Sequence, residues 1–263
     1  MAGPPRLMPS GRHQAGLPVL PLRRAWLQVL LAGLLAPSWA GAAVVRQRPL
    51  PPLAGSQLRL VVEFLTLSAQ LQTHYVMVGA SGSGIDIKAL TRASHRRASQ
   101  LLRRMRTELR NRIPPPELQP MVLRWQTVLD ALITPPSLEV ARLMLPMARE
   151  AAAPLQRALP AYDMRRSRSS EARARRQLLL AQLQLHGSQA CWDNGFVDWP
   201  LLAEQRSTLS AWLDDLIRKD ITSVRLQAQW NLFSTALPLR GARCLPNAID
   251  TLHNVGEILA PLL

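Results

Sequence analysis

The sequence predicts an all-helical chain that folds as two tandem antiparallel four-helix bundles. Apolar residues recur at spacings of three and four along most of the 263 residues, as they do in amphipathic helices. Glycine is sparse outside short breaks, and no long stretch alternates apolar and polar residues as a half-buried strand does. Short breaks place consecutive helices antiparallel to one another, so eight helices predict two bundles of four.

The first 43 residues have the three parts of a signal peptide. An arginine-containing polar region precedes a mostly apolar run over 25–36, and small residues predominate over 38–43. The apolar run is shorter than the ~20 residues of a membrane span, so we expect cleavage near 40–43 and release into the periplasm. Arg23-Arg24 also fits a twin-arginine signal, so Sec and twin-arginine export are both expected routes. An uncleaved signal anchor is a third alternative.

A linker and a first four-helix unit follow. Residues 44–55 hold three prolines and predict the linker. The first unit covers 56–162 and has a glycine-rich turn at 79–84. Its helices are expected near 56–78, 86–111, 118–132 and 140–162. Pro146 and Pro154 fall inside the fourth helix, so we expect that helix to kink or to end early.

The second four-helix unit covers 163–263. Its arginine-rich start, 163–177, predicts either a helical connector or a loop, and a helix then continues to about His186. Residues 187–195 begin and end with glycine, so we expect a loop there. The remaining helices are expected near 199–218, 226–237 and 245–259.

The third helix of each unit carries the same short pattern, with an offset of 105 residues. The matching positions are Trp125, Val128, Ala131 and Leu132 in the first unit and Trp230, Phe233, Ala236 and Leu237 in the second. A chance match between two amphipathic helices is the alternative. The shared helix order favours an internal duplication.

The layout and the pattern around Trp230 resemble the sensing domain of PilJ-type chemotaxis transducers of type IV pili. That domain is related to the NarX-type nitrate/nitrite input domain. Both are duplicated four-helix units, and their third helix carries a Q-W-x-x-F-x-x-A-L string. Gln229, Trp230, Phe233 and Leu237 fit this string, and Trp125 to Leu132 fit it more loosely. The resemblance implies a sensing domain.

The first helix departs from the family pattern. In the family it reads approximately N-x-A-G-R-Q-R-M-L-S-Q-R, with Tyr-Leu a few residues later. Here Leu67-Ser68-Ala69-Gln70 and Tyr75-Val76 echo that pattern, whereas Glu63-Phe64-Leu65 stands where R-Q-R is expected. In NarX-type sensors an arginine of this helix helps to bind the anion, and the first unit lacks its counterpart.

The sequence holds no pattern that predicts catalysis, a cofactor or a metal. The five histidines lack metal-ligand spacing, and no nucleophile elbow, phosphate-binding loop or dinucleotide fingerprint is present. His74 and His186 lie near expected helix ends, where surface positions are the simplest expectation. Asp214 and Asp215 are neighbours on a helix, so their side chains point about 100° apart and do not form a carboxylate pair.

Two cysteines, Cys191 and Cys244, follow the fifth and the seventh expected helices. In an up-down bundle these two breaks lie at the same end. Export to an oxidising compartment then predicts a disulfide between them. The alternative is two free thiols.

The chain is strongly basic, with a net charge of +15 that falls to +11 if 1–43 are removed. All but two of its basic residues are arginine, and they crowd 92–112 and 165–176. Patches of this kind bind nucleic acid or anionic membrane surfaces, and a solvated surface is the simplest alternative. Export argues against nucleic acid.

These observations predict an exported sensing or binding module that is not an enzyme. Its expected partners are a small anion or another small ligand, together with an envelope or membrane signalling protein. Monomeric and homo-oligomeric forms both fit the sequence, which does not specify the ligand-binding residues. The alternative is a structural or interaction protein of the cell envelope, with a basic surface and no ligand site.

Overall fold

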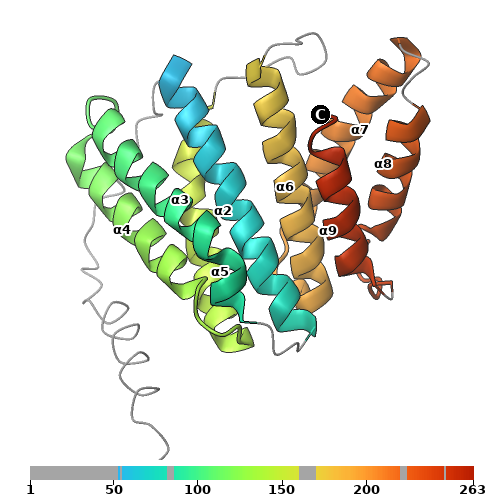
Figure 1. Cartoon of the computed structure of the whole chain (residues 1–263), viewed down its shortest axis with the longest axis horizontal. Coiled ribbons are helices and arrows are strands. Elements are labelled where there is room, and N and C mark those ends of the chain that lie inside the picture. The colour runs from blue at the N-terminus through green and yellow to red at the C-terminus, as the bar shows by residue number, and fades with distance from the viewer. Residues whose placement is uncertain (1–52, 54, 82–85, 160–169, 220–223, 246) are drawn as a thin grey trace, which may run out of the picture. The chain divides into compact units, whose positions relative to one another are not determined.

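The computed structural model describes residues 53, 55–81, 86–159, 170–219, 224–245 and 247–263 (Figure 1). The predicted signal peptide lies outside the described residues, and so does the predicted linker except for Leu53 and Gly55. Leu53 is buried in the core, and its N–H donates to the carbonyl oxygen of Ala158 at 3.0 Å. The end of the predicted linker is therefore part of the folded chain.

The described helices follow one another with short connections. They are α2 (Gly55–Ser81), α3 (Ile87–Glu108), α4 (Pro115–Ala131), α5 (Leu138–Arg157), α6 (Ser170–Trp192), α7 (Trp199–Lys219), α8 (Val224–Ala236) and α9 (Ala248–Leu259), with a 3-10 turn, η1 (Asn194–Phe196), after α6. Local sequence sets several helix starts. Asp86 and Ser137 cap α3 and α5 with their side-chain oxygens. Pro115 begins α4. An N–H at the start of a helix has no intrahelical acceptor, so proline, which lacks this N–H, loses no hydrogen bond there.

The two prolines of α5 lie inside the helix, which ends at Arg157. The helix thus ends early, which is one of the two outcomes expected from these prolines, and Tyr162 lies outside the described part. The predicted boundary between the two units, 162/163, also falls in the undescribed range 160–169.

The predicted loop over 187–195 is wrong, because α6 continues to Trp192 and carries Cys191 in its last turn. Gly187 stands inside this helix. A Cβ atom at that position would lie 2.8 Å from a methyl carbon of Leu252 and 2.9 Å from one of Leu237. The glycine thus permits close packing of α6 instead of a chain reversal.

The predicted turn at 79–84 also begins too early, since α2 continues to Ser81. Gly79 is helical, and a Cβ atom there would lie 2.5 Å from the indole ring of Trp192 on α6. As at Gly187, a contact with another helix explains the glycine.

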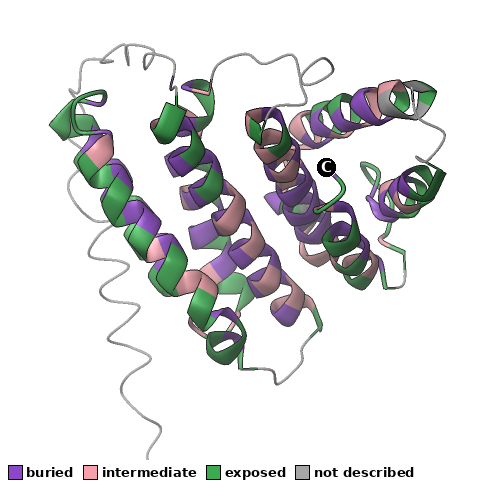
Figure 2. Cartoon of the chain, turned by 45° about the horizontal axis from the view of Figure 1, so that its top comes forward, coloured by how far each residue is buried: buried purple, intermediate pink, exposed green. Residues whose placement is uncertain are grey.

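Residues 49–263 form one compact unit in which α2 and α6 lie side by side (Figure 1). The contact between α2 and α6 is the most extensive between any two described helices. The helix α2 also contacts α3 and α5, and α6 also contacts α7 and α9. Buried residues accordingly surround much of α2 and α6, whereas the outer helices expose one face (Figure 2).

Two hydrophobic clusters fill the interior. The first joins α2, α3, α4 and α5 and takes in Leu178, Ala181 and Leu185 of α6. The second joins α6, α7, α8 and α9. Because α6 contributes to both clusters, it connects the two halves of the core.

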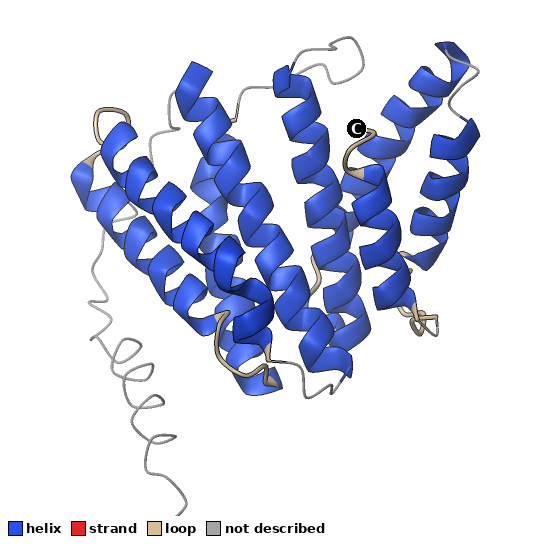
Figure 3. Cartoon of the chain, viewed as in Figure 1, coloured by secondary structure: helices blue, strands red, loops and turns tan. Residues whose placement is uncertain are grey.

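The prediction of an all-helical chain is confirmed for the described residues, which form eight α-helices and no strand (Figure 3). Within the same residues, no helix has the length and apolarity that a bilayer crossing requires.

Candidate functional site

A small pocket lies between α2, α4, α5, α6 and α7. Its polar lining residues are Gln72, Arg149, Gln156, Gln182, His186 and Gln189, and we call it the glutamine pocket. Its volume is about 60 Å³. A water molecule occupies about 30 Å³ of liquid and drug-sized ligands need several hundred, so this pocket fits a few waters or one small ion.

The apolar wall of the pocket includes Trp125 of α4. The Trp125 indole is 1% exposed, and its Nε1 donates to the carbonyl oxygen of Ala151 at 3.3 Å. Its ring meets that of Phe64 edge to face, with centroids 4.9 Å apart. These contacts fix the position of the indole in the wall, so its one N–H donor is already used and the polar lining residues supply the groups for a ligand.

A chain of hydrogen bonds begins at His186 on α6. The Nδ1 atom of His186 lies 3.0 Å from Oε1 of Gln205, and Nε2 of Gln205 donates to Oε1 of Gln182 at 3.0 Å. Because an amide oxygen only accepts, Nδ1 of His186 carries the proton and Nε2 is the acceptor of the neutral ring.

Burial lowers the pKa of His186 to about 4. This pKa value also includes an upward shift from the hydrogen bond to Gln205 and the carboxylate of Asp198, and a smaller downward shift from the positive charge of Arg149. The ring is therefore uncharged near neutral pH.

Gln189 has an unmet hydrogen-bonding group in the same region. Its side chain is 3% exposed, and its Oε1 has no hydrogen-bond partner among the described residues. Leaving such an acceptor unpaired costs about 1–3 kcal/mol. A water that donates a hydrogen bond to this oxygen would remove this cost.

Arg149 of α5 is the one charged residue among the described lining residues. It donates to the backbone carbonyl oxygen of Phe196. A guanidinium has five N–H donors, so this single bond leaves others for a ligand. The amides and Arg149 together form a donor-rich site without a lining carboxylate, which favours a neutral polar molecule or an anion over a cation.

The residues of the predicted repeat do not converge on one site. Trp125 lines the glutamine pocket, and Leu132 is buried in the first cluster. Trp230, Phe233 and Leu237 belong to the second cluster, where the rings of Trp230 and Phe233 stack with centroids 5.7 Å apart. Gln229 is half-buried on α8.

The two cysteines are at disulfide distance. The Cα atoms of Cys191 and Cys244 lie 5.4 Å apart, within the range of native disulfides. Their bond connects the end of α6 to the segment between α8 and α9, and the sequence reasoning found this pair.

The expectation of a surface or end-of-helix position is wrong for His186, whereas His74 is half-buried in the second half of α2. His186 is buried inside α6, and His74 of α2 contacts His253 of α9, with ring centroids 5.3 Å apart. Burial lowers the pKa of His74, and the neighbouring His253 lowers it further. Within the described residues, no three His, Cys, Asp or Glu side chains gather closely enough to hold a metal ion.

Sequence reasoning missed the lining residues Gln182, His186 and Gln189. The sequence does contain a signal for them. Polar residues occur on every side of α6, which is a long helix with many leucines and alanines, so some of these polar residues must be buried. A helix that buries such residues needs partners for them. The resemblance to PilJ-type and NarX-type domains stays an expectation, since we find no family model, curated protein or solved structure that matches this chain.

Proposed function

We propose that this protein is an exported, non-catalytic sensing or binding module with two tandem four-helix bundles, which takes a small polar ligand in the glutamine pocket. The helix contacts support two bundles. In the first half α2 contacts α3 and α5, and α4 contacts the same two helices. In the second half α6 contacts α7 and α9, and α8 contacts the same two. Each half thus forms a closed ring of four helices, as in the resembled family.

The position of the glutamine pocket carries the proposal. Its lining comes from α2, α4 and α5 of one ring and from α6 and α7 of the other. A ligand that bonds to both rings favours one arrangement of the rings over the alternatives. Such a bias is what a sensing module passes to its partner, which we propose to be a signalling protein of the envelope or membrane.

The lining chemistry favours a small anion. Arg149 supplies positive charge, the amides supply N–H donors, and no Asp or Glu is among the described lining residues. The volume of about 60 Å³ restricts the ligand to a few non-hydrogen atoms. Nitrate and nitrite meet both conditions, as do other small oxyanions.

Thermal unfolding of the full chain with a panel of small anions tests the proposal. An anion at about a hundred times its Kd adds about 2.7 kcal/mol to stability. We expect at least one anion to raise the Tm of the native protein and of the control variant Arg142→Gln, which changes an exposed arginine of the same helix. The variant Arg149→Gln should lose the shift.

Two outcomes contradict this assignment. A panel in which no anion changes the Tm favours the alternative, a structural envelope protein without a ligand site. An equal Tm shift in Arg149→Gln and in the native protein removes the glutamine pocket as the site. Export is tested separately, because N-terminal sequencing of protein from the periplasm should find a start near residues 40–43.

A further inference from the structure

The outer surface of α3 carries a row of cations. Five of them, Lys88, Arg92, Arg96, Arg103 and Arg106, are all exposed. At 100° per residue these five fall within an arc of about 80°, and they extend over about 27 Å of the helix. We call them the basic stripe.

The basic stripe has no counter-charge of its own. No Asp or Glu occurs in α3 before Glu108, at its last position. Of the surrounding carboxylates, Glu63 pairs with Arg97 and Glu108 with Arg104, at 2.6 Å and 3.1 Å. Among the described residues, no ion pair involves a member of the stripe.

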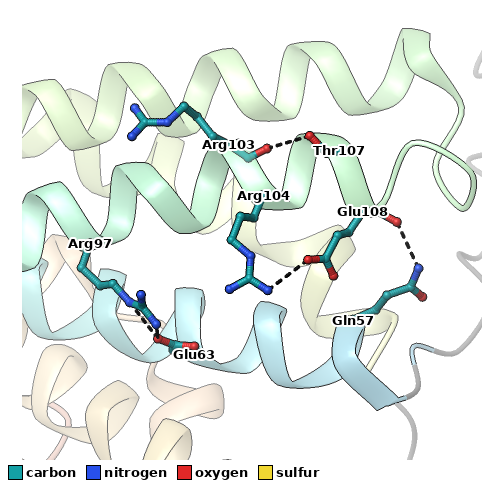
Figure 4. Close-up of polar contacts among 7 residues, drawn as sticks. All are labelled: Gln57, Glu63, Arg97, Arg103, Arg104, Thr107 and Glu108. Carbon is teal, nitrogen blue, oxygen red and sulfur yellow. Dashed lines mark hydrogen bonds and ion pairs between the residues drawn. The ribbon is translucent and has the colours of Figure 1, made fainter.

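Figure 4 shows how this separation arises. Arg97 and Arg104 point toward Glu63 and Glu108, whereas Arg103 projects from another side of the helix, away from both carboxylates. The opposite face of α3 is apolar and buried. Packing and ion pairing thus use the other faces of α3 and leave the stripe in contact with solvent.

We propose that the basic stripe docks the protein on a bilayer surface that contains anionic phospholipid. Cations that all face one direction along a straight helix can approach one plane of phosphates together. Guanidinium binds phosphate in bidentate fashion, and four of the five cations are arginine. A row of four to eight basic residues on a helix is a typical anionic-lipid site.

Two other partners fit the stripe less well. Single-stranded nucleic acid is usually held by aromatic side chains that stack on bases, and α3 contains no Phe, Tyr or Trp. A protein partner usually needs a buried aromatic or arginine anchor in a pocket, and the stripe residues lie on a convex helix surface. A lipid surface requires only charge and a long line of contact.

Vesicle flotation of the full chain tests this docking. We expect binding to vesicles of equal phosphatidylglycerol and phosphatidylcholine at about 0.1 M salt, with weaker binding to phosphatidylcholine alone and at higher salt. The stripe variant combines Arg92→Gln, Arg96→Gln, Arg103→Gln and Arg106→Gln. Each lost cation weakens binding about fivefold, so we expect a loss of more than a hundredfold.

A matched control separates position from net charge. It combines Arg124→Gln, Arg225→Gln, Arg240→Gln and Arg243→Gln, which are exposed and lie outside α3. We expect this variant to bind nearly as well as the native protein. Both variants retain residues 1–43, so any contribution of that segment to binding is common to both. Circular dichroism and the Tm of each variant verify that both are folded.

Three results would overturn the proposal. The first is native protein that binds phosphatidylglycerol vesicles no better than phosphatidylcholine vesicles. The second is an equal loss of binding in the stripe and control variants, which would make net charge sufficient. The third is a preference for a short DNA duplex over the anionic vesicles at equal phosphate concentration, which would assign the stripe to nucleic acid.

Discussion

At the scale of single residues, His186 links the glutamine pocket to the pH dependence of stability. The side chain is buried and neutral, and its Nδ1–H bonds to Gln205. The pKa is about 4 in the folded chain and 6.5 in the unfolded chain. Between these values the unfolded chain binds more protons, so acid favours unfolding. His74, whose pKa burial also lowers, acts in the same direction.

We expect the contribution of His186 to the free energy of unfolding to be fully present above pH 6.5 and to be lost as the pH decreases toward 4. The loss attributable to His186 is roughly 3 kcal/mol over that range. Urea unfolding at several pH values measures it. The variant His186→Gln should show a flatter profile by about this amount, and an unchanged slope would contradict the assignment.

At the scale of helices, the contact between α2 and α6 depends on a small residue opposite a large one. Gly79 of α2 faces the indole of Trp192 of α6, whose ring also meets those of Tyr75 and Phe196. The absence of a Cβ atom lets the two helix ends approach closely. The gain from this contact outweighs the weak helix propensity of glycine.

The variant Gly79→Ala should be destabilised by about 1–3 kcal/mol, because the new methyl group forces the indole to move. In the background Trp192→Leu the same change should be neutral or stabilising, since alanine favours a helix by about 1 kcal/mol over glycine. A double-mutant cycle of urea unfolding measures this change of sign. Equal effects in both backgrounds would show that the indole is not the obstacle.

These helix contacts explain which elements the sequence predicted and which it did not. The helices α3 and α9 bury one face, so an apolar stripe locates them to within a few residues. The helix α6 is buried on nearly all sides and has no such stripe. Its Gly187 resembles a turn residue in the sequence, although the leucines of other helices determine its role. Gln189 is buried and Gln182 is half-buried, and only their distant neighbours show that both line one pocket.

At the scale of the whole molecule, the Cys191–Cys244 pair joins segments 53 residues apart in sequence. The sequence predicted the pair from the antiparallel order of the helices, and the order was sufficient even though Cys191 lies in a helix and not in a loop. A cross-link over that separation reduces the entropy of the unfolded chain by an amount equivalent to roughly 4 kcal/mol.

The double variant Cys191→Ser with Cys244→Ser should therefore lose up to about 4 kcal/mol of stability relative to the oxidised protein. Thermal unfolding with and without a thiol reductant is the measurement. Reductant should lower the Tm of the native protein and leave that of the double variant unchanged. A native protein whose Tm is insensitive to complete reduction would contradict a stabilising role for the bond.

The pairing of α2 with α6 also determines when the first half of the core can form during synthesis. The chain emerges with its N-terminus first, and α2 is complete at Ser81, whereas α6 begins at Ser170. At 5–20 residues per second, roughly 5–20 s pass between the completion of α2 and the start of α6, the helix that α2 contacts most. During that interval its uncovered apolar side is a target for chaperones, and the first half of the core closes only when the second half has begun to appear.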